Sequence, residues 1–159
     1  MNLPRPTPPT PGVEHRLYLR EEELDQAVDL LFAAARRFWR AAEGPLAAHN
    51  LGPAHYRALA AVRRRAPVTV GALRTHLDVT KQSLARVLNE IEAAGLIARA
   101  ADPRDRRARL ISLTAAGAEA ERAATATLRE RLAHVFRAVG AEAVSGARVV
   151  LASLAEDAP

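Results

Sequence analysis

Residues 68–97 read VTVGALRTHLDVTKQSLARVLNEIEAAGLI, and this stretch decides the fold. Its apolar residues recur every three or four positions in two segments, a short one at 70–76 and a longer one at 81–94. This spacing places the apolar side chains on one face of a helix. Asp78-Val79 leaves only a tight turn between the two segments. The stretch therefore predicts a helix-turn-helix unit.

The second helix of this unit has two chemically different faces. Thr80 suits its N-cap, because a threonine hydroxyl can accept a main-chain N–H of the first turn, and Gly95 suits its C-terminal end. The apolar face consists of Leu84, Val87, Leu88 and Ile91. Hydroxyl, amide and basic side chains fill the other face: Thr80, Lys81, Gln82, Ser83, Arg86 and Asn89. Such groups suit hydrogen bonds to phosphates and base edges, so this face is a candidate DNA-contacting surface.

A polar hairpin is predicted directly after this helix. Two short segments with strand character, 96–100 and 109–113, flank a loop at 101–108. The candidate contact residues here are Arg104, Asp105, Arg106, Arg107 and Arg109. Arginines on such a hairpin can reach phosphates or a narrow minor groove. The alternative is a hairpin whose charges only keep it soluble.

Helical patterns flank this unit on both sides. The apolar spacing and the turn residues predict further helices at 21–43, 53–65, 115–139 and 141–155, with a break at Gly140. The first helix and the last two are separated in sequence by the whole central unit. We therefore expect them to pack on one another or on a second copy of the chain.

Composition narrows the functional classes. The chain has 159 residues, a formal net charge of +5, 49% hydrophobic and 4% aromatic residues, and no cysteine. The charge weakly favours a polyanionic partner, and the lack of cysteine excludes disulfides and thiolate metal sites. There is no uninterrupted apolar run of 18 residues and no signal-peptide pattern. We therefore expect a cytoplasmic protein without a membrane-spanning helix.

Motifs for catalysis are not evident in the sequence. The histidines show no metal-protease spacing, and the chain has neither a phosphate-binding loop nor a nucleophile elbow. We expect no enzymatic activity and no cofactor. Two binding alternatives stay open. One is a metal-responsive regulator that uses His49 and His55, although their spacing is not diagnostic. The other is an interaction module that binds protein instead of DNA.

Three stretches together carry a family resemblance. They are the entry at 68–73, the helix and its exit at 79–97, and the hairpin at 102–114. The hairpin combines Asp105, Arg107 and Ile111 and is followed by Leu113, Thr114 and Gly117. In these stretches the chain resembles the MarR family of bacterial transcription regulators, and the resemblance extends from about residue 24 to 155.

The resemblance implies a mainly α (α+β) winged helix-turn-helix fold in a homodimer. The density of prolines in residues 1–13 predicts a proline-rich, largely disordered tail at 1–20. With the resemblance, the rest of the chain divides into an N-terminal dimerisation helix and linker at 21–50, a DNA-binding domain at 51–113, and C-terminal dimerisation helices at 114–159. The resemblance also implies double-stranded DNA as partner, with a pseudo-palindromic operator and repression as the commoner outcome.

Residue roles follow from the same resemblance. Arg107 would enter the minor groove from the wing, with Asp105 holding its guanidinium. The residues implied to face the major groove are Lys81, Gln82, Ser83 and Arg86. A small aromatic ligand that releases DNA is implied near His15, Tyr18, Phe38, Trp39, His49 and His55. Aromatic residues in that region also suit an ordinary core.

Overall fold

The computed structural model describes residues 20–103, 105 and 108–156. Apart from Arg20, the predicted proline-rich tail lies outside the described residues. The helices are α1 (Glu21–Arg40), α2 (Glu43–Ala47), α3 (Pro53–Arg65), α4 (Val70–Leu77), α5 (Lys81–Ala93) and α6 (Ala115–Glu156), and the strands are β1 (Val68–Thr69), β2 (Ile97–Ala101) and β3 (Arg109–Leu113). The fold is therefore rich in helix and contains a small sheet, as the sequence predicts.

The chain divides into two compact units. One unit is Ala35–Arg131, and the other combines the residues up to Ala34 with those from Leu132 onward. The first of these units contains the whole predicted segment 51–113 and also the end of α1 and the start of α6. Helices α1 and α6 each belong in part to both units.

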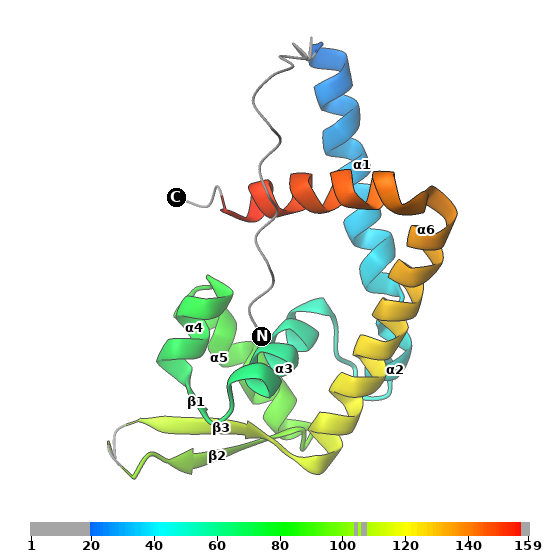
Figure 1. Cartoon of the computed structure of the whole chain (residues 1–159). Coiled ribbons are helices and arrows are strands. Elements are labelled where there is room, and N and C mark those ends of the chain that lie inside the picture. The colour runs from blue at the N-terminus through cyan, green and yellow to red at the C-terminus, as the bar shows by residue number, and fades with distance from the viewer. Residues whose placement is uncertain (1–19, 104, 106–107, 157–159) are drawn as a thin grey trace. The chain divides into compact units, whose positions relative to one another are not determined.

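The sheet of the Ala35–Arg131 unit is antiparallel, with the strand order β1-β3-β2. Val68 pairs with Ile111 between β1 and β3, and Ile97 pairs with Leu113 between β2 and β3. In Figure 1, α3, α4 and α5 gather beside this sheet, and β2 and β3 extend from it as a hairpin. This arrangement is a helix-turn-helix followed by a wing.

A single apolar core holds the helix-turn-helix to the sheet. Leu59 of α3, Leu73 of α4 and Ile111 of β3 are fully buried in it. The predicted apolar face of α5 is confirmed, since its buried residues are Leu84, Val87, Leu88 and Ile91. Burial of a leucine or isoleucine side chain stabilises a fold by about 1.5–3 kcal/mol, so these contacts fix the position of α5.

The predicted turn and caps are also confirmed. Asp78 adopts the left-handed conformation, with φ 49° and ψ 59°, and turns the chain between α4 and α5. The hydroxyl of Thr80 accepts the N–H of Ser83 at 3.2 Å and caps α5. Gly95 follows α5 with φ 72°, a conformation that costs a glycine little. These local features determine where the second helix begins and ends.

Several predicted boundaries differ from the structure, most of them by one residue. The helix predicted at 21–43 ends at Arg40, and a short helix, α2, follows it. Gly44-Pro45 is a typical helix-ending pair in sequence, but here these residues lie in the first turn of α2, where proline needs no N–H partner. Strand β2 also starts at Ile97, one residue later than expected, because Leu96 N–H still bonds the Ile91 carbonyl at the end of α5.

The predicted break at Gly140 is confirmed. Helix α6 runs from Ala115 to Glu156, but Gly140 has φ 82° and ψ 169°, which is not a helical conformation. Contrary to expectation, α6 is long and apolar enough to cross a membrane by length and composition alone. Polar residues interrupt the apolar pattern of α6, so the helix is apolar on average without containing an uninterrupted apolar run of 18 residues.

Candidate nucleic-acid interface

The described polar face of α5 projects from a firmly held helix. Lys81, Gln82, Ser83 and Arg86 are exposed, while the apolar residues between them are buried in the core. Arg57 of α3 donates to the carbonyl oxygen of Leu77 at 3.2 Å and so ties α3 to the turn that precedes α5. The side chains that sequence analysis assigned to the major groove therefore share one solvent-facing side of α5.

The wing is described only in part. Arg104, Arg106 and Arg107 lie outside the described residues, and so does the expected pairing of Arg107 with Asp105. Asp105 and Arg109 are exposed. The loop between β2 and β3 is closed by main-chain bonds: the Ala108 N–H donates to the Asp105 carbonyl at 2.9 Å, and the Asp102 N–H donates to the Ala108 carbonyl at 3.2 Å. The predicted hairpin is therefore present.

Arg99 links the wing to α5, and the sequence analysis missed it. Its Nη2 donates to Asn89 Oδ1 at 2.8 Å and lies 3.2 Å from Glu92 Oε2, so β2 is tied to α5. Asn89 thus has its amide oxygen occupied, although it was assigned to the DNA-facing side. The strand alternation gave a signal, since Arg99 lies on the same face of β2 as buried Ile97.

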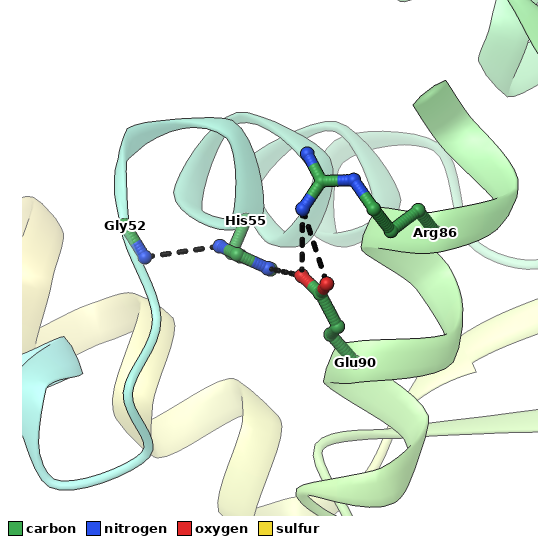
Figure 2. Close-up of polar contacts among 4 residues, drawn as sticks. All are labelled: Gly52, His55, Arg86 and Glu90. Atoms are coloured by element: carbon green, nitrogen blue, oxygen red, sulfur yellow. Dashed lines mark hydrogen bonds and ion pairs between the residues drawn. The ribbon is translucent and has the colours of Figure 1, made fainter. Parts of the chain in front are cut away.

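Arg86 is held by a chain of polar contacts (Figure 2). Its Nη1 donates to Glu90 Oε1 at 3.1 Å, one turn further along α5. The other carboxylate oxygen of Glu90 lies 2.5 Å from His55 Nε2, and the His55 Nδ1 accepts the N–H of Gly52 at 3.0 Å. The hydrogen bond from His55, more than the nearby Arg86 charge, lowers the pKa of the Glu90 carboxyl against the opposing effect of burial.

The described part of the chain shows no site with the chemistry of a metal centre. No group of three histidine or acidic side chains lies close enough together to hold a metal ion among the described residues. His55 has both ring nitrogens in hydrogen bonds, and His49 is exposed at the end of α2. The pair of histidines considered for metal binding is therefore not assembled into a ligand set.

The comparisons with known proteins agree with this geometry. The family model that matches residues 49–108 is described as the MarR family. The transcriptional regulator PetP of Rhodobacter capsulatus is 38% identical over 148 residues, which cover 93% of this chain and 89% of PetP. The chain belongs to the MarR family. It is a transcription regulator with a DNA-binding winged helix-turn-helix.

Solved structures of MarR-type proteins have the same fold. The crystal structure of MarR matches with a TM-score of 0.67 and 25% identity, over 85% of this chain and 96% of MarR. The repressor CouR, solved on a 23-mer DNA duplex, matches with a TM-score of 0.69 and 22% identity, over 86% of this chain and 98% of CouR. These likenesses cover more than the helix-turn-helix and the wing, which together form the winged unit (residues 51–113), and include parts of both terminal helical regions.

The residues that the MarR resemblance suggested for ligand binding have different surroundings. Tyr18 and His15 lie outside the described residues. The rings of Phe38 and Trp39 pack edge to face with centroids 5.4 Å apart, and Trp39 also contacts Tyr56 at 5.6 Å. Phe38 and Trp39 are partly buried and pack against the core. Phe38 and Trp39 are therefore the residues suggested for ligand binding that the structure shows in contact with each other.

A polar network that includes Tyr56, which contacts the Trp39 ring, joins α3 to α6. The Thr125 hydroxyl donates to Glu121 Oε1 at 2.7 Å, so the Tyr56 hydroxyl, 2.9 Å from Thr125 Oγ1, is the donor in that contact. Arg63 Nη1 donates to the other Glu121 oxygen at 3.0 Å. Glu121 is only 3% exposed, and it had not been singled out from the sequence. These hydrogen bonds hold the first part of α6 against α3.

Proposed function

We propose that this chain is a repressor that binds a pseudo-palindromic operator as a homodimer in the cytoplasm, without enzymatic activity. The observation that carries the proposal is the exposed polar face of α5, whose opposite face is buried in the core. A helix held in this way can enter a major groove with little loss of conformational freedom. Membership in a family of transcription regulators supports the absence of catalysis.

The contact residues divide between two grooves. On α5 they are Thr80, Lys81, Gln82, Ser83, Arg86 and Asn89, which face the major groove. On the wing they are Arg104, Asp105, Arg106, Arg107 and Arg109, which reach phosphates and the minor groove. Asn89 offers its amide N–H groups and the remaining lone pair of its oxygen, because Arg99 already donates to that oxygen. Base selectivity then comes from α5, and most of the salt-dependent affinity comes from the wing.

The exposed apolar residues of the terminal helices support the homodimer. None of the 20 residues of α1 is buried in the single chain, although Leu24, Leu31 and Phe32 are all apolar. The far end of α6 is similar, and its exposed apolar residues include Val139, Val150, Leu151 and Leu154. Apolar surface of this kind on a water-exposed helix marks an interface. A second copy would cover both regions at once.

A membrane is the other environment that could cover the apolar part of α6. Gly140 breaks the helix, however, and the piece that follows it, residues 141–156, is about 24 Å long at the helical rise. A bilayer core is about 30 Å thick. The piece also carries Glu142 and Arg148. A dimer accounts for the apolar surface of α1 and α6 together, so we assign both to the dimer.

We extend the proposal to a small aromatic effector that releases the operator. The partly buried rings of Phe38 and Trp39, which contact each other at the end of α1, support a ligand of this class because they offer an aromatic packing surface. A ligand that prefers a different spacing of the two DNA-binding units lowers DNA affinity, and DNA must lower ligand affinity by the same factor. Calorimetric titration of salicylate into the protein with and without operator duplex tests this, and equal affinities would overturn it.

Selection from a random-sequence duplex library tests the main proposal. The full chain should retain a pseudo-palindrome whose half-sites lie about one helical turn, roughly 34–36 Å, apart. Footprinting at two salt concentrations should show protection that weakens with salt, and the mass in solution should be that of two chains. Sequence-blind binding by a monomer would favour the protein-interaction module instead.

Three variants separate the two grooves. Gln82→Ala and Arg86→Ala should relax selectivity at particular base pairs, by about 1–3 kcal/mol for a lost bidentate contact. Arg107→Ala should weaken binding to most sequences and reduce the salt dependence. Arg129→Ala, an exposed arginine on α6, is the control and should bind like the wild type. Identical behaviour of the first three variants would overturn the division of roles.

A further inference from the structure

We propose that Glu90 and His55 are positioning residues that fix the direction of the Arg86 guanidinium, and that they thereby determine base selectivity at the position that Arg86 reads. The inference rests on the proposed function, because it takes Arg86 as a DNA contact. It adds two residues that sequence analysis did not assign to DNA selectivity. Neither of them needs to touch DNA itself.

The first step is the contact between Arg86 and Glu90. The two residues are four apart on α5, and Nη1 lies 3.1 Å from Oε1 and 3.5 Å from Oε2. Their side chains are 65% and 41% exposed. An ion pair this exposed would by itself be weak and mobile. It would not hold an arginine in one direction.

The second step is the anchor that α3 supplies to Glu90. His55 Nε2 lies 2.5 Å from Glu90 Oε2, and the His55 side chain is only 12% exposed. This contact joins residues 35 positions apart, so it fixes the Glu90 carboxylate relative to α3 as well as to α5. Figure 2 shows the resulting chain of contacts from the Gly52 main chain through His55 and Glu90 to Arg86.

The third step is the proton on His55. The Gly52 N–H donates to Nδ1, so that nitrogen presents its lone pair. The ring proton is therefore on Nε2, which donates to Glu90. Glu90 stays free of a proton and can accept from Arg86, and the hydrogen bond from His55 lowers the Glu90 pKa in the same sense. The chain of donors thus runs in one direction and ends with an oriented guanidinium.

Glu90 lies on the polar face of α5, where an acidic side chain is unfavourable for DNA binding unless it has a positioning role. Its charge repels phosphates, so a carboxylate that did nothing else would only weaken binding. By fixing the Arg86 fork, Glu90 lowers the freedom that Arg86 would lose on contacting a base. The expected result is an exchange of sequence-blind affinity for selectivity. A purely structural role would not produce changes of opposite sign in these two quantities.

The experiment uses the full chain and the duplex that the wild type selects. Arg86→Ala first identifies the base pair at which discrimination is lost. Glu90→Gln should then lower discrimination at that base pair about tenfold, within the range of one bidentate contact, while binding to unrelated duplex becomes tighter. In the Arg86→Ala background, Glu90→Gln should cause no further loss of discrimination. Glu119→Gln, which removes the exposed ion pair with Arg122 on α6, is the matched control and should change neither quantity.

Two substitutions of His55 separate positioning from folding. His55→Asn offers an oxygen near the place of Nδ1 for the Gly52 N–H but cannot reach Glu90, whereas His55→Gln offers an N–H near the place of Nε2. His55→Asn should lose the same discrimination as Glu90→Gln and keep its urea midpoint near that of the wild type. His55→Gln should retain most of the discrimination even where its midpoint falls.

Failure of the positioning role and failure of the proposed function would give different results. If the wild type selects a duplex and Glu90→Gln discriminates as well as the wild type, the positioning role is wrong. It is also wrong if Glu90→Gln loses affinity for every duplex in parallel with stability, or if the Glu90→Gln effect persists in the Arg86→Ala background. If the wild type selects no sequence at all, the proposed function fails, and this inference fails with it.

Discussion

Gly117 packs directly against the main chain of Leu96. A Cβ atom at position 117 would lie 1.8 Å from the carbonyl oxygen of Leu96 and 2.8 Å from its carbonyl carbon. The same oxygen accepts the N–H of Thr114 at 3.0 Å, and the Thr114 hydroxyl donates to the carbonyl of Gly95 at 2.8 Å. The first turn of α6 is thereby fixed against the end of α5.

Gly117→Ala should destabilise the winged unit. The atom in the way belongs to the main chain and cannot move aside as a side chain could, so we expect a loss of about 1–3 kcal/mol, as for an overpacked core. The urea midpoint measures it. Gly71→Ala is the control, because a Cβ there meets nothing within 4 Å. A Gly117→Ala protein as stable as Gly71→Ala would show that α6 can shift away from Leu96.

The Arg63–Glu121 pair should respond asymmetrically to substitution. Glu121 is buried, whereas the Arg63 side chain is 45% exposed. Arg63→Ala leaves a buried carboxylate short of a donor and should cost about 2–3 kcal/mol. Adding Glu121→Met should recover much of the loss, because the buried charge disappears and Thr125 and Tyr56 still satisfy each other.

Urea unfolding of the single and double variants measures this coupling. Arg122→Ala, which breaks an exposed ion pair with Glu119 on the same helix, is the control and should cost about 0–1 kcal/mol. If the double variant were less stable than Arg63→Ala alone, the Glu121 carboxylate would stabilise the fold through contacts other than its ion pair with Arg63.

The helix-turn-helix could be predicted because its determinants are local. Thr80 caps α5 with its own hydroxyl, Gly95 takes the conformation that a helix end needs, and Pro53 begins α3. The helical period separates buried from exposed positions on α5 without reference to any other part of the chain. These rules also gave the exposed polar face that forms the candidate site.

The contacts that refine the site could not be predicted in the same way. His55 meets Glu90, and Arg99 meets Asn89, only after α3, α5 and β2 have docked. The contact of His55 with the Gly52 N–H is local, but nothing local indicates that the other ring nitrogen meets Glu90. The short helix α2 was missed because Gly44-Pro45 suits either a helix end or a helix start.

A charge on the C-terminal apolar surface should prevent dimer formation. Leu151 is 57% exposed in the single chain, so Leu151→Glu costs little there, but in a dimer it would bury an unpaired carboxylate. We expect the mass in solution to halve and operator affinity to fall sharply. Glu142→Lys, a charge exchange on the same helical piece, is the control.

The thermal midpoint gives a second readout of the dimer. If folding and association are coupled, the wild-type midpoint should rise with protein concentration, whereas that of Leu151→Glu should not. A Leu151→Glu protein that keeps the mass of two chains would place the interface elsewhere.

His76 should make the stability depend on pH below neutrality. Burial, followed by the charges of Arg65, Arg64 and Arg57, lowers the pKa of His76 from its usual value of 6.5. Just below pH 6.5 the unfolded chain therefore binds a proton that the folded chain does not yet bind. Stability is full above this pH and falls as the pH decreases toward the folded pKa. His76→Gln should flatten the pH dependence of the urea midpoint in this window.

The arginine contribution to this shift can be tested separately. In a proton NMR titration of the His76 ring, Arg64→Ala and Arg65→Ala should each move the pKa back toward 6.5. Added salt should act in the same direction, because it screens exposed charges. Burial would remain as the salt-independent part of the shift. A pKa that responds to neither substitution nor salt would leave burial as its entire cause, and the basic residues around α4 would then exert no measurable field on His76.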